Sequence, residues 1–274
     1  MRNLDEMTIT QAVLANNSRI GDDRLCEIMT SLVQNLHAFA RDIKLTETEW
    51  QWGIDFLGRM GEANTTGHPQ FALLSHVLGI STLVLAQNNR KPAGCTETAA
   101  FNAVSEQPPL LLDLGADLST NPLAPKGYVQ GSVLDTAGSP VPHASLEINP
   151  GSDEAPGRVL LQADEQGRYH FCTTLPDHQC IREDSPVGQI LGALNRPAWR
   201  PAHLEFTVRA VGYQRLTTRV FREGDPYLEA DPLFAVRSAL VAQWQWHAPG
   251  TTPVGTLSSD PFYTLAFDFV LAKN

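Results

Sequence analysis

The chain has 274 residues, of which 42% are hydrophobic, and its formal net charge is −10 with a pI near 5.2. This length is sufficient to bury a large core in one or two domains. The acidic balance, with no cluster of lysine and arginine, argues against nucleic acid as a partner.

The first residues do not form a basic segment followed by an apolar core, and no run of about 18 apolar residues occurs, so we expect no secretory signal, no membrane span and a cytoplasmic location. The four cysteines, Cys26, Cys95, Cys172 and Cys180, are scattered and lack C-x-x-C spacing. We expect free thiols rather than disulfides or a zinc site.

Residues 1–88 are predicted to form a helical N-terminal domain. Apolar residues recur every three or four positions, as in one face of a helix: Leu25, Ile28, Met29, Leu32, Leu36, Phe39 and Ile43. Thr46 and Glu49 have the spacing of a capping box and predict the start of a second helix. A third helix is expected around residues 71–80. His37, His68 and His76 are interpreted as ordinary helix or loop histidines.

Residues 89–126 are rich in proline and glycine and are predicted to form an irregular linker. From residue 127 to 274 short β-rich runs alternate with turn signals such as DTAGSP and DEQG. Seven or eight such strands predict an antiparallel β-sandwich. The expected fold class is therefore α+β, with a helical domain followed by a sandwich.

The most informative stretch is WRPAHLEFTVRAVGY, residues 199–213. Its apolar and polar residues alternate with the period of a half-buried strand, so that His203 and Glu205 share one face. Arg200 lies just upstream, before Pro201, which favours an extended backbone. The plainest interpretation is a solvated polar strand face, because charged residues are mostly exposed.

The RPAH run, with the later GY and GDPYL segments, resembles the signature region of the intradiol ring-cleavage dioxygenases, the catechol and hydroxyquinol 1,2-dioxygenases. The words GCTETAA and GSVLDTAGSPVPHASLEI resemble other parts of that family. The N-terminal words IMTSLVQNLHAFARDIKLTETEW and LLSHVLGIS resemble its helical domain, which supplies a dimer interface. The resemblance therefore implies the same fold and a homodimer.

Members of this family bind ferric iron with two tyrosinates and two histidines, and several of these positions differ here. The resemblance places His203 at the first histidine and Glu205 at the second. The loop after Asn149 contains no tyrosine, and the second tyrosine position falls on Gln179. Arg219 takes the place of a pocket glutamine. Ordinary ferric cleavage is therefore not expected, and the chain is interpreted as a divergent member that lacks most of the iron ligands.

The main hypothesis is a metal-free enzyme without a cofactor. His203 and Glu205 would act as an acid/base pair, with the carboxylate raising the pKa of the imidazole, and Arg200 would stabilise developing negative charge. The expected reaction is isomerisation, cyclisation, dehydration or hydrolysis of a phenolic, quinonoid or polyketide-like molecule. The expected substrate-binding residues are Arg219, Gln179, His178 and Cys180.

Two alternatives remain open. In the first, the protein is a metal-dependent dioxygenase in which His203, Glu205 and His178 bind iron or zinc, because two histidines and one carboxylate suit both metals. In the second, it is a catalytically inactive homologue that serves as a binding or partner subunit, since a fold persists when its function changes.

Overall fold

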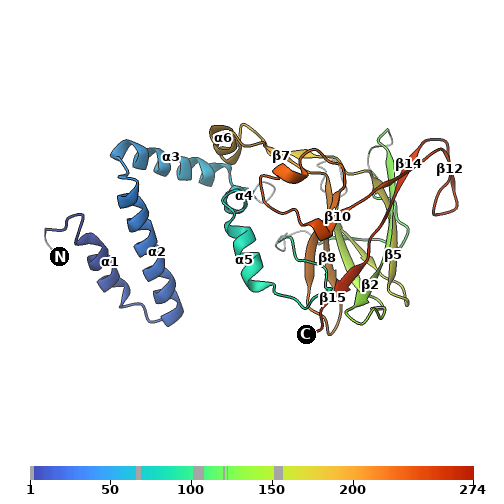
Figure 1. Ribbon diagram of the computed structural model, residues 1–274, viewed down its shortest axis with the longest axis horizontal. Coiled ribbons are helices and arrows are strands. Elements are labelled where there is room, and N and C mark those ends of the chain that lie inside the picture. Colours follow the sequence, from blue (N-terminus) through green and yellow to red (C-terminus); the bar gives the residue numbers. More distant parts are fainter. Residues whose placement is uncertain (1–2, 66–68, 101–107, 120, 122, 151–156) are drawn as a thin grey trace. The chain divides into compact units, whose positions relative to one another are not determined.

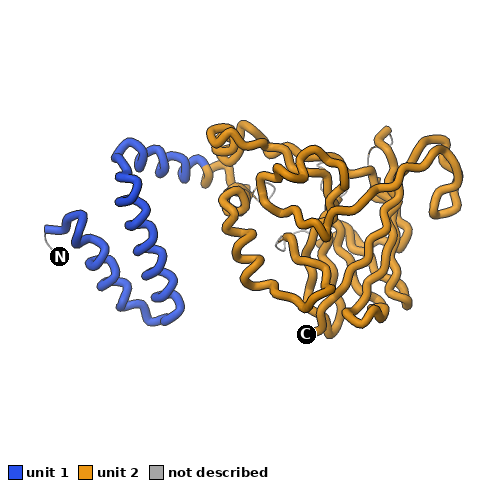
Figure 2. The backbone as a smooth tube through the Cα atoms, in the orientation of Figure 1, with its two compact units in different colours: residues 1–59 blue, residues 60–274 orange. Residues whose placement is uncertain are grey.

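A computed structural model describes residues 3–65, 69–100, 108–119, 121, 123–150 and 157–274; His68 lies outside these ranges. The chain divides into two compact units, Met1–Arg59 and Met60–Asn274 (Figure 2). The helical part of the chain is thus shared between the two units. We describe each unit by itself.

The first unit consists of helices. They are α1 (Ile9–Asn17), α2 (Asp23–Asp42) and most of α3 (Glu47–Ala63). The predicted capping box is confirmed at the start of α3, where the Glu49 N–H donates to Thr46 Oγ1 over 3.3 Å and the Thr46 N–H donates to Glu49 Oε2 over 2.9 Å. The predicted apolar stripe lies on α2, and Leu32 and Phe39 remain 47% and 54% exposed. The packing of α1 on α2 therefore leaves this stripe uncovered.

Helices α4 (Gln70–Val77) and α5 (Ile80–Asn88) belong to the second unit, although the sequence groups them with the helical domain. The reason is local packing: α4 lies against α6 (Pro186–Ala193), and Arg196 Nη1 donates to the carbonyl of Val77 over 2.9 Å. This contact brings residues of α4 close to the sheets of the same unit.

Two sheets form a sandwich in the second unit, as the sequence predicted (Figure 1). The first sheet has the order β1 (Leu110–Leu111), β4 (Val159–Gln162), β3 (Ser145–Asn149), β8 (His203–Arg209), β9 (Leu216–Arg222) and β10 (Val241–Ala242). The second has the order β11 (Gln245–His247), β14 (Phe262–Ala266), β2 (Lys126–Asp135) and β15 (Phe269–Leu271), with β5 (Arg168–Thr174) also paired to β2. Both sheets are mixed rather than purely antiparallel as expected, because β1 and β4, β9 and β10, β2 and β14, and β2 and β15 pair in parallel.

Short elements complete this unit. They are the paired strands β6 (Gln179–Cys180) and β7 (Trp199–Arg200), the paired strands β12 (Gly250–Thr251) and β13 (Leu257–Ser258), and the 3₁₀ helices Leu228–Ala230 and Ser238–Leu240. The core between the two sheets contains Val129 and Phe171 from one sheet and Leu146, Leu204 and Phe206 from the other, each at most 2% exposed.

Strand β8 shows the predicted alternation. Leu204, Phe206 and Val208 point into the sandwich core, so His203 and Glu205 lie on the opposite face of the sheet. That face is not solvated, because His203 is only 3% exposed. The interpretation as a wet strand face is therefore wrong: chain segments outside the sandwich core cover the polar face as well.

In the part of the chain that the structure describes, no single helix has both the length and the apolar composition needed to cross a membrane. The helices α4 and α5 meet that criterion only when taken together, across a bend of 79°.

Gly131 in β2 provides a test of the close packing inside the sandwich. A Cβ atom at this position would lie 1.8 Å from the carbonyl oxygen of Phe267, which also accepts a hydrogen bond from Tyr169 Oη over 2.6 Å. We expect Gly131→Ala to lower the free energy of unfolding by about 2–3 kcal/mol, because backbone must shift to admit the methyl group. Urea titration followed by tryptophan fluorescence measures this effect.

The matched control is Gly192→Ala in α6, where a Cβ atom meets nothing within 4 Å. Alanine should stabilise this helix slightly, by about 0.5–1 kcal/mol. Equal unfolding midpoints for the two variants would contradict the close approach at Gly131.

Candidate functional site

The candidate site lies on the outer face of the six-stranded sheet, at the pairing of β8 with β9. The antiparallel register places Glu205 opposite Arg219 and His203 opposite Phe221. Directly opposed residues lie on the same face, so the four side chains are neighbours. Arg219 Nη2 and Nε lie 2.8 and 2.9 Å from Glu205 Oε2, and Arg219 Nη1 donates to the carbonyl of Ala99. Glu205 is therefore paired with an arginine rather than with His203.

Arg200 approaches this group from β7. Its Nη1 lies 3.4 Å from His203 Nε2, and its Nε lies 3.6 Å from Asp231 Oδ1. Burial, followed by the charge of Arg219, lowers the pKa of Arg200 to about 10. Nε and Nη2 are buried and have no hydrogen-bond partner within the described residues. Unsatisfied buried donors on a guanidinium indicate a place for an anionic ligand.

His203 is held in one tautomer. Its Nδ1 lies 2.8 Å from the carbonyl oxygen of Pro201 and must donate to it, so Nε2 keeps its lone pair. Burial, followed by the charges of Arg200 and Arg219, holds the pKa of His203 well below its ordinary value. The prediction that Glu205 raises the pKa of this imidazole is wrong, because the carboxylate is engaged by Arg219 and the arginines act in the opposite direction.

Two residues of this site were missed by the sequence analysis. Asp231 has a side chain only 2% exposed, faces Arg200, and accepts from the Ala235 N–H over 2.9 Å. The charges of Arg219, Arg200 and Glu205 change the pKa of His76 in α4. Burial, followed by the two arginines, lowers this pKa to about 4. His76 was interpreted as an ordinary helix histidine, and its helical spacing gives no signal of a sheet that lies more than a hundred residues further along the chain.

The other predicted site residues lie on or beside the β6–β7 pair. Gln179 is opposite Arg200 and Cys180 is opposite Trp199. Cys180 is exposed, and desolvation followed by Glu183 raises the pKa of its thiol, so it is not an activated nucleophile.

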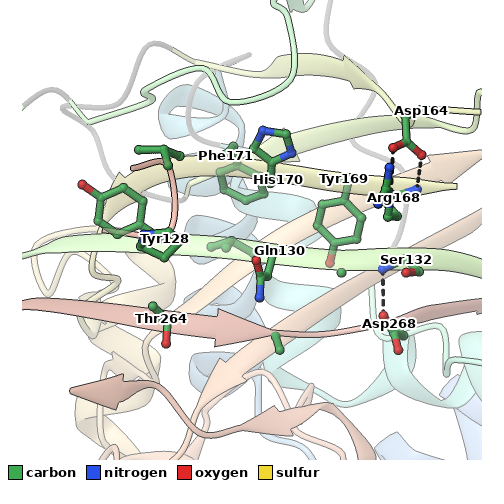
Figure 3. Close-up of a pocket in the computed structure, with 15 residues that line it drawn as sticks. Tyr128, Gln130, Ser132, Asp164, Arg168, Tyr169, His170, Phe171, Thr264 and Asp268 are labelled. Carbon is green, nitrogen blue, oxygen red and sulfur yellow. Dashed lines mark hydrogen bonds and ion pairs between the residues drawn. The ribbon is translucent and has the colours of Figure 1, made fainter. Parts of the chain in front are cut away.

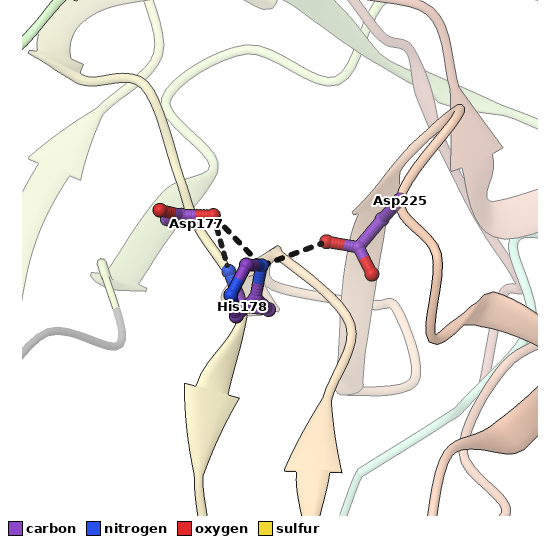
Figure 4. Close-up of side chains that lie close together, drawn as sticks. All are labelled: Asp177, His178 and Asp225. Carbon is purple, nitrogen blue, oxygen red and sulfur yellow. Dashed lines mark hydrogen bonds and ion pairs between the residues drawn. The ribbon is translucent and has the colours of Figure 1, made fainter.

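His178 points to a different group. Its Nδ1 lies 3.0 Å from Asp177 Oδ1 and 3.9 Å from Asp225 Oδ2 (Figure 4). Among the described residues, this is the only group of three or more histidine, cysteine or acidic side chains with ligand atoms close enough to share a metal ion. The structure therefore brings Arg200, His203, Glu205 and Arg219 together but places His178 elsewhere.

The donors around β8 fit a bound metal ion in part. His203 Nε2 and the second oxygen of the Glu205 carboxylate are an imidazole and a carboxylate on one strand face, a donor pair that non-haem iron accepts. Arg200 and Arg219 add two positive charges beside them, which oppose a cation. The residues therefore fit a metal best when an anionic ligand is bound with it.

A separate pocket of about 710 Å³ lies on the other sheet (Figure 3). It is lined by Tyr128, Gln130 and His170 of β2 and β5 and by Thr264 of β14, among others. It shares no residue with the group around β8. We regard the β8 group as the functional site because it contains buried titratable side chains with displaced pKa values.

The buried imidazoles predict a dependence of stability on pH. The folded protein holds His76 with a pKa of about 4, below the ordinary value of 6.5, so the unfolded chain binds more protons between these values. The free energy of unfolding should therefore fall as the pH decreases from about 6.5 to about 4, and the fall should be shallower in His76→Gln. Urea unfolding across this range measures how the free energy of unfolding changes with pH. His170→Gln, which changes an exposed residue, is the control. A slope unchanged by His76→Gln would contradict the burial of this side chain against the arginines.

Comparison with known proteins identifies the family. Residues 22–96 match the model described as catechol dioxygenase N terminus, and residues 113–273 match the model described as dioxygenase. The chain is 39% identical to the 6-chlorohydroxyquinol 1,2-dioxygenase of Cupriavidus pinatubonensis, with 99% of each chain covered. It is 36% identical to the hydroxyquinol 1,2-dioxygenase of Rhodococcus opacus, covering 97% of this chain and 94% of the relative. The solved hydroxyquinol 1,2-dioxygenase of Pseudomonas putida DLL-E4 superposes with a TM-score of 0.86 at 32% identity, over 98% of this chain and 99% of the other.

These relatives correct the main functional hypothesis. A metal-free isomerase or cyclase that lacks a cofactor is contradicted by relatives at 34–39% identity that are named ring-cleaving dioxygenases. The loss of the iron site was inferred from replaced tyrosines, and the names of these relatives contradict this inference. His203 and Glu205 are an imidazole and a carboxylate, which are donors that iron accepts. The metal-dependent alternative is favoured. The fold, the two family models and the full-length similarity lead to one conclusion: this chain belongs to the intradiol ring-cleavage dioxygenase family.

Proposed function

We propose that this protein is an iron-dependent intradiol dioxygenase that cleaves a hydroxyquinol, a benzene ring with three hydroxyl groups. The observation that carries the proposal is the similarity over nearly the whole chain to relatives named hydroxyquinol and chlorohydroxyquinol 1,2-dioxygenases. Intradiol cleavage breaks the bond between two adjacent hydroxyl-bearing carbons and adds both atoms of dioxygen, which yields two carboxylates. The helical and sheet-rich parts of the chain both contribute side chains to the site.

Arg200 is the residue best placed to bind the substrate. Its Nε and Nη2 are buried and make no hydrogen bond within the described residues, although Nε faces Asp231 at 3.6 Å, and its pKa of about 10 keeps the guanidinium charged at neutral pH. A ring that carries ionised hydroxyl groups would satisfy these donors. The hydrogen bonds would strengthen as negative charge moves onto the oxygen atoms of the substrate during cleavage.

His203 and Glu205 would hold the iron. The Nδ1–H of His203 donates to the carbonyl of Pro201, and Arg219 fixes one oxygen of Glu205, so both donors are oriented by neighbouring groups. When bound, iron makes the reaction of the aromatic ring with dioxygen possible. The negative charge of the substrate offsets Arg200 and Arg219, and we therefore expect substrate and metal to stabilise each other's binding.

His76 would position a substrate hydroxyl. Its low pKa keeps the imidazole neutral, and a neutral imidazole both accepts and donates a hydrogen bond. A hydroxyl of the ring would pair with it without the cost of burying a further charge. The support for a third hydroxyl on the substrate remains the names of the relatives.

The first experiment measures oxygen consumption and ring cleavage by protein loaded with iron. We expect hydroxyquinol to be cleaved with a kcat/KM about tenfold or more above that of catechol, because an unfilled polar position in the pocket is costly. Removal of iron by a chelator should abolish cleavage, and iron should restore it. Iron-loaded protein that consumes no oxygen with hydroxyquinol would contradict the proposal.

A matched pair of variants tests the role of Arg200. Arg200→Met should lower kcat/KM about 100-fold, the usual cost of a buried donor to a developing charge, while the iron content stays unchanged. Arg209→Met is the control, since Arg209 lies on the same sheet but pairs with Glu147 away from the site. Equal losses of kcat/KM in the two variants would show that Arg200 affects only the stability of the folded protein.

We further propose that the protein is a homodimer in which α2 contributes to the interface. The support is the uncovered stripe of this helix, in which Leu25, Ile28, Leu32, Leu36 and Phe39 are each 47–54% exposed, together with the match of residues 22–96 to the N-terminal family model. A contiguous apolar stripe of this kind on a water-facing helix is unfavourable unless another chain covers it.

Charge placed on this stripe should separate the subunits. We expect the double variant Leu32→Glu and Leu36→Glu to change the molar mass from that of a dimer to that of a monomer in light scattering coupled to size-exclusion chromatography. Gln34→Glu, on an exposed polar position of the same helix, should remain dimeric. A monomeric unmodified protein, or a variant that stays dimeric, would contradict this interface.

A further inference from the structure

We propose that Asp177, His178 and Asp225 form a second metal site, one that binds a divalent cation of the zinc type. The site lies beside the β6–β7 pair and uses none of the residues that would hold iron. It therefore goes beyond the proposed ring cleavage and does not depend on it.

Figure 4 shows His178 between the carboxylates of Asp177 and Asp225. His178 Nδ1 lies 3.0 Å from Asp177 Oδ1 and 3.9 Å from Asp225 Oδ2, and all three ligand atoms lie within 4.8 Å of one another. In a tetrahedral zinc site with bonds of about 2.0–2.2 Å, neighbouring ligand atoms are about 3.3 Å apart. The His178–Asp177 distance is close to this value, and the His178–Asp225 distance must shorten by about 0.6 Å when a metal binds.

The surrounding structure holds two of the ligands in place. Asp225 Oδ1 accepts from the Tyr227 N–H over 2.9 Å, and Asp225 Oδ2 accepts from the Ala202 N–H over 3.1 Å. The His178 ring packs edge-on against Trp199 and Tyr227, with ring centroids 4.9 and 5.2 Å away. A site whose ligands are already oriented loses little conformational entropy when the metal binds.

Asp225 is the buried carboxylate of the cluster, and its two hydrogen bonds come from backbone N–H groups that carry no full charge. Its side chain is only 3% exposed, yet among the ion pairs of the described residues its only partner is the His178 imidazole at 3.9 Å. A buried carboxylate without a charged partner is costly. The nearest arginine along the chain, Arg222, donates instead to the carbonyl of Pro176 over 3.3 Å. A bound cation would supply the missing positive charge.

The donor set selects the class of metal. One imidazole nitrogen and two carboxylate oxygens are donors that zinc accepts, and three protein ligands leave a fourth position for water. Asp177 is 76% exposed, so that position opens toward solvent. Calcium and magnesium prefer six or more oxygen ligands, and neither uses imidazole readily.

The proposed zinc site also adjoins the group around β8. The Ala202 N–H that Asp225 binds belongs to the residue before His203, and His178 precedes the strand that pairs with Arg200. A metal held here would tie the β6–β7 pair to the loop that follows β9. It would therefore stiffen the backbone on either side of Arg200 and His203.

The test is a calorimetric titration of the iron-loaded protein with zinc, with both metals counted per chain. We expect one zinc ion to bind with the iron content unchanged. His178→Gln and Asp177→Asn should each weaken zinc binding on the order of 100-fold, because each removes one of three ligands. His170→Gln and Asp184→Asn, which change exposed residues outside the cluster, should bind zinc as the unmodified protein does.

Three outcomes would overturn the proposal. They are the absence of zinc binding, a zinc ion taken up at the expense of iron, and an affinity that the His178 and Asp177 variants leave unchanged. Asp177 is largely exposed, so its variant is expected to fold, and circular dichroism verifies this. Cobalt in place of zinc gives an additional readout, since a tetrahedral site produces intense visible bands and an octahedral one does not.

Discussion

The ion pair between Glu205 and Arg219 is the interaction on which the site depends. It exists because β8 and β9 pair in a register that places these two residues opposite each other on the outer face of the sheet. A shift of one residue would send His203 and Glu205 into the apolar core, where neither would find a partner. The three apolar residues of β8 that pack into the sandwich therefore fix the polar residues of the site as well.

The electrostatic balance of the site follows from this pairing. Arg200 and Arg219 face Glu205 and Asp231, while the imidazoles of His76 and His203 are kept neutral by burial and by the arginines. The charges of the two arginines and the two carboxylates nearly cancel. Arg200 still has two buried nitrogen atoms, Nε and Nη2, that make no hydrogen bond within the described residues. In the function that we propose, an anionic ring would satisfy these donors, and its charge would offset the two guanidinium groups beside a metal cation. We therefore expect the binding of metal and substrate to be coupled.

The β6–β7 pair links this site to its surroundings. It carries Arg200 on one strand, and it ends beside His178, whose ring is held by Trp199 and Tyr227. The carboxylate of Asp225 reaches the same place from the loop after β9 and is buried there without an arginine or lysine partner among the described ion pairs. Two clusters of different chemistry thus lie on either side of one short strand pair, and changes in one are expected to alter the rigidity of the other.

The sequence by itself determined the features that rest on local patterns. The alternation in residues 203–209 predicted the strand and its apolar face, the Thr46–Glu49 box predicted a helix start, and RPAH with GDPYL identified the family. These signals depend on neighbours a few residues away, where side-chain period and backbone hydrogen bonding act directly.

Only the tertiary structure decided which groups meet. It paired Glu205 with Arg219 instead of His203, turned His178 toward Asp225, and brought His76 and Asp231 to the site. Replaced tyrosines in the sequence suggested that iron chemistry was lost, and the similarity to named dioxygenases over nearly the whole chain overturned that interpretation. Long-range packing sets these partners, and no periodicity within one segment contains that information.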